Sequence, residues 1–244
     1  MYHREQRGLT MRSRYWIAAL TASMVAVTAT STPARAVDWH TVASWTMGEG
    51  PGSRVMRDGS GNGLDGTVGS EVVPSGGTYG FARLEPDTPP AHPQHLVVVP
   101  DYPDLDPGDR DYAFSVRLRT AAPFGNVVQK GQATVAGGSF KMQLPGGKVQ
   151  CWFRGSAGQL MVTAPRPIND RAWHTISCLR YRSGASVAVD GVVVASKSGP
   201  TGTISNAWPL SIGGKTTCDQ IEVGCDYFAG ELDWVTVHTP AYAW

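Results

Sequence analysis

The sequence predicts an all-β protein, a two-sheet antiparallel β-sandwich of the jelly-roll type. Two observations lead to this prediction. Apolar and polar residues alternate with period two in several stretches, as they do in strands that are buried on one face and exposed on the other. Turn-forming residues separate these stretches, in a chain whose 29 Gly and 17 Pro disfavour long helices. Many short antiparallel strands in one chain are typical of sandwiches and jelly rolls.

Three neighbouring stretches show the alternation most clearly. In residues 112–119 and 139–144, apolar side chains point to one face and most of the others are polar. A Pro-Gly-Gly turn at 145–147 connects the second stretch to a third one, residues 148–153. Within that third stretch, Trp152 stands on the face opposite to the buried set.

A second hairpin is predicted where Asp190-Gly191 separates two apolar runs, 186–189 and 192–195. Asp-Gly supplies the positive φ values that a two-residue type I′ turn requires. The remaining strand candidates are residues 41–47, 94–99, 126–130, 172–181, 209–213 and 232–238. The total is about a dozen short strands, with no convincing amphipathic helix and no internal repeat.

The N-terminal 36 residues are predicted to be a secretory signal peptide. Arginines between positions 4 and 14 precede an apolar run, 15–27, which is shorter than the roughly 20 residues that span a bilayer. Ala34-Arg35-Ala36 then matches the A-x-A cleavage pattern. A retained signal anchor is the alternative, and Met11 is an alternative start. Cleavage leaves 37–244 as a single secreted, extracellular domain with no segment inserted in a membrane.

Charge and cysteine content narrow the class of protein further. The 21 basic and 20 acidic residues nearly balance, so no overall field attracts the chain to nucleic acid. An even number of cysteines in an exported protein indicates disulfides, and four cysteines allow three pairings. Cys151–Cys178 is favoured because both lie in strand-like segments, and Cys218–Cys225 because it closes a short loop. A zinc site is the alternative, which neither the spacing nor the compartment supports.

Three stretches in order along the chain carry a family resemblance. The first joins S-W-T-M-G-E-G to D-G-S-G-N-G-L-D-G-T within residues 44–67, and the second runs from W-H-T-I to V-A-V-D-G within 173–191. The third joins L-S-I-G-G to F-A-G-E-L-D-W-V-T-V within 210–237. Together they resemble the concanavalin A-like lectin/glucanase superfamily, in particular the laminin G-like and pentraxin-like domains of exported bacterial proteins. The resemblance implies a concanavalin A-like sandwich and, by itself, no particular activity.

A structural calcium site is expected near the glycine-rich loop at 58–65. Calcium takes six to eight oxygen ligands, and this loop offers carboxylates, an amide and freed carbonyls. The resemblance implies that Asp58, Asn62 and Asp233 meet around one Ca²⁺ ion, with Asp65 as an additional ligand. The alternative is that the loop residues are turn formers whose side chains cap backbone amides.

Catalysis is not expected from this sequence. Glycosidases of this superfamily carry paired acids on one strand, in the pattern E-x-D-x-E or E-x-D-x-x-E. Glu231 and Asp233 begin that pattern, but Val235 and Thr236 occupy the positions of the second Glu. The motifs G-x-S-x-G and H-E-x-x-H are absent. A glycan-active enzyme with an unorthodox site is therefore the least favoured function.

The ligand-binding candidates are exposed aromatic residues and their polar neighbours, because lectins stack sugar rings on aromatic side chains. Trp152 is the first candidate, with Gln150 beside it on the same outward face. Arg117 and Arg119 share the outward face of another strand and would flank Trp152 if both strands lie in the concave sheet. The second candidates, both expected in loops, are Trp208 and Tyr227. The alternative for each is a side chain that only covers the outer face of a sheet.

The sequence therefore favours a secreted, non-catalytic domain that binds an extracellular polysaccharide or glycan. A protein–protein or adhesion module is the alternative, because laminin G-like domains also bind proteins.

Overall fold

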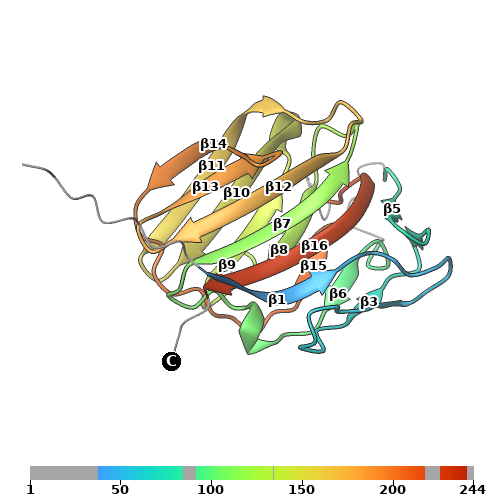
Figure 1. Ribbon diagram of the computed structural model, residues 1–244, viewed down its shortest axis with the longest axis horizontal. Coiled ribbons are helices and arrows are strands. Elements are labelled where there is room, and N and C mark those ends of the chain that lie inside the picture. The colour runs from blue at the N-terminus through green and yellow to red at the C-terminus, as the bar shows by residue number, and fades with distance from the viewer. Residues whose placement is uncertain (1–37, 85–91, 134, 218–225, 241–244) are drawn as a thin grey trace, which may run out of the picture. The chain divides into compact units, whose positions relative to one another are not determined.

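The computed structural model describes residues 38–84, 92–133, 135–217 and 226–240, and its strands form two antiparallel sheets packed face to face (Figure 1). In the first sheet, the order is β14 (Val192–Ser198), β13 (Gly184–Val189), β12 (His174–Tyr181), β7 (Tyr112–Arg119), β16 (Gly230–Pro240), β5 (Tyr79–Phe81) and β4 (Val72–Pro74), with β1 (Trp39–Trp45) also paired to β16. In the second sheet, the order is β11 (Gly158–Pro167), β10 (Lys148–Gly155), β9 (Ser139–Gln143), β8 (Asn126–Lys130), β15 (Leu210–Ile212), β6 (Val97–Val99), β3 (Gly66–Val68) and β2 (Val55–Met56). These two sheets confirm the predicted β-sandwich.

Helix is limited to two short 3₁₀ turns in the described part of the chain. They are η1 (Pro103–Leu105) and η2 (Pro145–Gly147), and the second is the predicted turn between β9 and β10. The described residues contain no helix long and apolar enough to cross a membrane.

The hydrophobic core lies between the two sheets and is built by the predicted alternation. Tyr112 and Phe114 of β7 face the second sheet, where the Phe140 ring of β9 lies 5.1 Å from each of their ring centroids. Phe153 of β10 also packs on Phe114, at 6.0 Å. All four side chains are at most 1% exposed, so the strands of both sheets contribute their apolar faces to one core.

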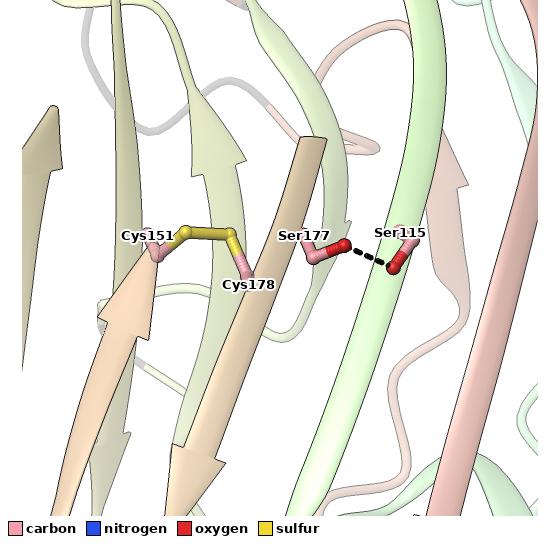
Figure 2. Close-up of a disulfide and its surroundings, with 4 residues drawn as sticks. All are labelled: Ser115, Cys151, Ser177 and Cys178. Atoms are coloured by element: carbon pink, nitrogen blue, oxygen red, sulfur yellow. Dashed lines mark hydrogen bonds between the residues drawn. A yellow bond between two sulfur atoms is a disulfide. The ribbon is translucent and has the colours of Figure 1, made fainter. Parts of the chain in front are cut away.

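A disulfide crosses this core and joins the two sheets (Figure 2). It links Cys151 of β10 to Cys178 of β12, with the two Cα atoms 5.6 Å apart. This confirms the first predicted pairing, whereas Cys218 and Cys225 lie outside the described residues. On the outer face of the first sheet, a hydrogen bond 2.7 Å long joins the hydroxyl groups of Ser115 and Ser177.

The hairpin between β13 and β14 has the predicted turn. Asp190 and Gly191 have φ values of 51° and 79°, as a type I′ turn requires. Other strands were not predicted: β2, β3, β4, β5 and β11. Strand β11 is the longest of these and forms the edge of the second sheet beside β10.

Two buried cations stabilise the loops at the sheet ends. The Lys130 ammonium is fully buried and donates to the carboxylates of Asp101 and Asp106, both at 2.8 Å, and to the Asn206 carbonyl oxygen at 2.6 Å. Arg180, which is 1% exposed, donates to the Thr201 hydroxyl and to backbone carbonyl oxygens. Since each buried charge has its partners, both side chains contribute to the scaffold.

Candidate functional site

Cross-strand register places a row of outward side chains across the second sheet. Trp152 of β10 pairs with Met161 of β11 on one side and with Lys141 of β9 on the other. Lys141 in turn pairs with Gln129 of β8, which pairs with Ser211 of β15. Because directly paired residues in antiparallel strands share a face, these five side chains form one continuous row.

A second row, made of side-chain amides, runs beside the first. Gln150 of β10 pairs with Gln143 of β9, which pairs with Asn126 of β8. The Gln143 amide donates to the Gln150 side-chain oxygen, and Gln150 donates to the Thr163 hydroxyl at 2.9 Å. Asn126 donates to the Gln129 side-chain oxygen at 2.8 Å, which connects the two rows. The amides therefore hold each other in place on the surface of the sheet.

Members of both rows and of the loops around β8 line a hollow of about 240 Å³, which we call the amide groove. Its lining residues are Phe124, Gln129, Gly131, Gln132, Ala133, Ser139, Phe140, Lys141, Gln143, Trp152, Lys215 and Asp226. Gln150 stands beside Trp152 and Gln143 at its border. Strands β8, β9 and β10 form the floor, and the loops before and after β8 form part of the rim.

Charged groups in the amide groove are few and contact other groups. The Lys141 ammonium lies 4.6 Å from the centroid of the Trp152 ring, a cation–π contact. Lys215 pairs with Asp226 at 2.8 Å, and their side chains are 8% and 6% exposed. Asp226 also accepts a hydrogen bond from the Asn126 amide at 3.3 Å. Amides and aromatic rings therefore outnumber the charges.

Three polar atoms in groove-lining residues have no hydrogen-bond partner among the described residues. They are Trp152 Nε1, Gln132 Oε1 and Asp226 Oδ1. Asn126 Oδ1, which does not line the groove, is a fourth. Buried polar atoms in proteins are nearly always hydrogen-bonded to protein or ordered water. One donor and three acceptors are therefore buried in or next to groove-lining residues without a partner among the described residues.

Arg117 and Arg119 do not flank Trp152, because β7 belongs to the first sheet and β10 to the second. On the outer face of the first sheet, both guanidinium groups lie 4.9 Å from the centroid of the Trp173 ring. Arg119 also pairs with Glu231 at 2.8 Å. Trp173 is half-buried on this face.

The two aromatic second candidates also lie apart from the amide groove. Trp208 is half-buried, and its backbone N–H donates to the Asn206 side-chain oxygen at 3.0 Å. Tyr227 packs edge-on against the rings of His92 and His95, at 6.1 and 5.3 Å between centroids. Neither side chain lines the groove.

The loop at 58–65 is organised by its own hydrogen bonds. Asp58 Oδ1 accepts from the backbone N–H groups of Ser44 and Ser60, each at 2.9 Å. Asp58 Oδ2 accepts from the Ser60 hydroxyl at 2.7 Å and from the Leu64 N–H at 3.1 Å. Burial alone would raise the pKa of Asp58, but these hydrogen bonds outweigh it and lower the pKa. The carboxylate thus acts as a cap for backbone amides.

The other expected calcium ligands have partners as well. Asn62 uses its amide N–H to reach the Val42 carbonyl oxygen at 2.8 Å, and Asp65 accepts from Arg57 at 2.6 Å. Asp233 is paired with Arg117 on the face of the first sheet. Among the described residues, no three His, Cys, Asp or Glu side chains are grouped as a metal site requires. As placed here, the four residues do not fit a calcium ion.

Comparison with known proteins assigns this architecture to a family. A sequence profile of the concanavalin A-like lectin/glucanases superfamily, of the laminin G type, matches residues 94–242. This chain is a member of that superfamily. No curated protein matches its sequence.

Solved structures with a similar fold are laminin G-like and other binding domains. Domains LG4-5 of the mouse laminin α1 chain match with a TM-score of 0.52 and 19% identity, over 69% of this chain and 45% of that one. The binding domain of Paraclostridial Mosquitocidal Protein 1 matches at 0.59 and 15%, over 84% and 50%. Domain 4 of AbnA, a GH43 extracellular arabinanase from Geobacillus stearothermophilus solved with arabinotriose, matches at 0.58 and 14%, over 84% and 95%. The chain spans about half the length of the first two structures.

The laminin G-like fold of this chain also occurs in glycosidases, which carry a pair of catalytic acids. This chain has only the first part of their sequence pattern. Glu231 and Asp233 are both held in ion pairs by arginines, on the outer face of the first sheet.

Sequence reasoning missed several groove residues, among them Phe124, Lys215 and Asp226. These three come from loops around the sheet, where no strand periodicity marks a side chain as facing the groove.

Proposed function

We propose that this protein is an exported, non-catalytic binding domain that holds a carbohydrate in the amide groove. Export is supported by the predicted signal peptide and by the Cys151–Cys178 disulfide, a bond typical of oxidising compartments. The absence of a complete acid pair from the sequence pattern supports a binding role over catalysis.

The single observation that carries the proposal is the juxtaposition of the Trp152 ring with the row of side-chain amides, Gln150, Gln143 and Asn126. Sugars present apolar C–H faces that stack on aromatic rings, and hydroxyl groups that both donate and accept hydrogen bonds. The amide groove offers the matching surfaces, since Gln129 and Gln143 line it together with the ring and Gln150 stands next to Trp152 on β10.

The unused polar atoms support a hydroxyl-rich ligand. Trp152 Nε1 requires an acceptor, whereas Gln132 Oε1 and Asp226 Oδ1 require donors. These atoms are buried in groove-lining residues, so a sugar hydroxyl or an ordered water reaches them after a small shift of the side chains. The arabinotriose complex of the similar arabinanase domain adds support at the level of the fold.

A glycan and polysaccharide array, probed with the purified protein, tests the proposal. We expect a defined set of bound glycans, and we expect Trp152→Ala to weaken their binding at least about tenfold because one stacking surface is lost. The matched control is Trp234→Ala, which removes a half-buried tryptophan on the outer face of the first sheet and should leave binding intact.

A blank array from folded protein, or equal losses for both tryptophan variants, would contradict carbohydrate binding in the groove. A protein ligand is the second candidate, supported by the fold similarity to laminin G domains, and a pull-down from extracellular extract would test it next. A structural calcium ion has no part in this proposal, because the oxygens of Asp58 already accept hydrogen bonds.

A further inference from the structure

We propose that the amide groove binds a stretch of a linear sugar chain longer than one ring, and that Phe124 is a second stacking residue at its far end. The inference rests on the proposed carbohydrate function and names the class of ligand: a chain of sugars, recognised along its length.

Phe124 is an exposed aromatic side chain that lines the same groove as Trp152. It is 37% exposed and precedes β8, whereas Trp152 projects from β10, two strands away. A single exposed apolar residue is ordinary on a protein surface. What distinguishes Phe124 is that it borders a polar hollow whose opposite end carries another aromatic ring.

The backbone around Phe124 is fixed, so its ring is presented with little freedom to lose. The Pro123 carbonyl oxygen accepts from the Gly147 N–H at 2.7 Å, and the Gly125 carbonyl oxygen accepts from the Leu144 N–H at 3.0 Å. Gly125 also packs closely, since a Cβ there would lie 2.7 Å from the Phe228 Cα. Binding to a preorganised surface costs less entropy than ordering a mobile loop.

The separation of the two rings sets a minimum length for the ligand. Strands in a sheet lie about 4.8 Å apart, so β8 and β10 are roughly 10 Å apart across the sheet. Phe124 lies further along, beyond the start of β8 at Asn126. One sugar ring cannot cover both aromatic side chains, whereas a short chain can.

The floor between the rings suits the hydroxyl groups of such a chain. Lys141 and Gln143 of β9, the strand between β8 and β10, line the groove together with Gln129 of β8. Stacking at each end and hydrogen bonds in the middle match a ligand whose apolar faces and hydroxyl groups repeat along its length.

A chain-length series measured by isothermal titration calorimetry tests the inference. The probes are arabinan, xylan, cellulose and mannan oligosaccharides, each from the monosaccharide to the hexasaccharide. For the series that binds, we expect affinity to rise with length and then level off. We expect Phe124→Ala to weaken binding of the long oligosaccharides roughly tenfold while leaving the shortest bound ones unchanged, and Phe124→Tyr to retain most of the affinity.

The controls separate this inference from the proposed function. Val73→Ala removes another exposed apolar side chain, from β4 of the first sheet, and should change neither affinity nor melting temperature. Affinity that depends on Trp152 but not on chain length would overturn the inference and leave the function standing. The inference is also overturned, again without loss of the function, if Phe124→Ala binds long oligosaccharides as the wild type does or weakens all lengths equally. If no oligosaccharide or polymer binds, both proposals fail.

Discussion

The outer faces of the two sheets both carry a tryptophan beside cationic side chains, yet they differ in what is left to bind. On the first sheet, Trp173 contacts Arg117 and Arg119. These arginines are paired with Asp233 and Glu231. On the second sheet, Trp152 contacts Lys141 and lines a hollow together with the uncharged amides of Gln129 and Gln143.

The difference shows how a face that can bind a ligand is distinguished from a face whose charged side chains are already paired. Charges that are already paired lose their water when a ligand covers them and gain no new partner in return, so a ligand gains little there. In the amide groove, the amides of Gln129 and Gln143 and the ring of Trp152 line a hollow in which a ligand can replace water. We therefore expect substitutions of fully partnered groups to change stability, and substitutions in the amide groove to change binding.

The largest expected effect comes from the disulfide that ties the two faces together. Replacing both Cys151 and Cys178 by Ala should lower the free energy of unfolding by about 3 kcal/mol, given a sequence separation of 27 residues. Urea unfolding of the variant and the wild type measures the loss. Unchanged stability would show that the link does not restrain the two sheets.

Asp58 represents the fully partnered groups. Asp58→Ala removes the acceptor of four hydrogen bonds and should destabilise the protein by about 1–3 kcal/mol, measured by thermal melting. Since the pKa of Asp58 is lowered on folding, this contribution is present at neutral pH and declines as the pH falls through the acidic range.

The same melts with EDTA test the calcium prediction. We expect no change in melting temperature for the wild type, because the Asp58 carboxylate already has its partners. A drop on EDTA that calcium reverses would restore the sequence-based prediction of a calcium site at this loop.

Gln132 represents the groove. Gln132→Leu removes the Oε1 atom that has no partner among the described residues, so stability should stay within about 0.5 kcal/mol of the wild type or rise. Binding of the ligand found on the array should weaken several-fold. A variant with a much lower melting temperature but normal ligand affinity would show that Gln132 stabilises the fold and does not contribute to binding.

A smaller, pH-dependent effect on stability is expected at His174, the first residue of β12 in the first sheet. Burial alone would lower the pKa of His174, but hydrogen bonds from its ring to Asp190 at 2.8 Å and Asp170 at 3.2 Å raise it overall. A raised folded-state pKa means that the stabilisation is complete below the unfolded value of 6.5 and is lost as the pH rises through the higher folded value. Unfolding measured from about pH 5 to 8 should show this decline, and His174→Gln should remove it.

The smallest effect is expected at Arg119. Its ion pair with Glu231 is partly exposed, with side chains 43% and 36% accessible, and such pairs contribute about 0–1 kcal/mol. Arg119→Ala should therefore alter stability little and glycan binding not at all. Loss of binding in this variant would move the ligand to the first sheet and break the comparison.

Much of the fold could be predicted because strand alternation is a local signal. Strands β7 and β8 begin and end at the predicted residues, and the buried set of β10 is correct. Strand β11 was missed because Pro165 and Pro167 disfavour strands, whereas an edge strand tolerates proline where no ladder hydrogen bond is needed.

The site was predictable only in part. Period-two alternation gave Trp152 and Gln150 their outward direction, but it could not give the order of the strands. Arg117 and Arg119 have the same outward direction on a strand of the other sheet. Gln129 could not be predicted as a groove residue either. All five residues of β8 are buried, so no alternation marks the side of the strand that faces the groove.

The alternation of side chains across β9 and β10 has a consequence for how the protein can evolve. Cys151 and Phe153 face the core, and Trp152 between them faces the amide groove. Selection for a folded protein and selection for a ligand therefore act on interleaved but separate positions of the same strands. A descendant can change the outward-facing positions that line the groove while inheriting its core unchanged.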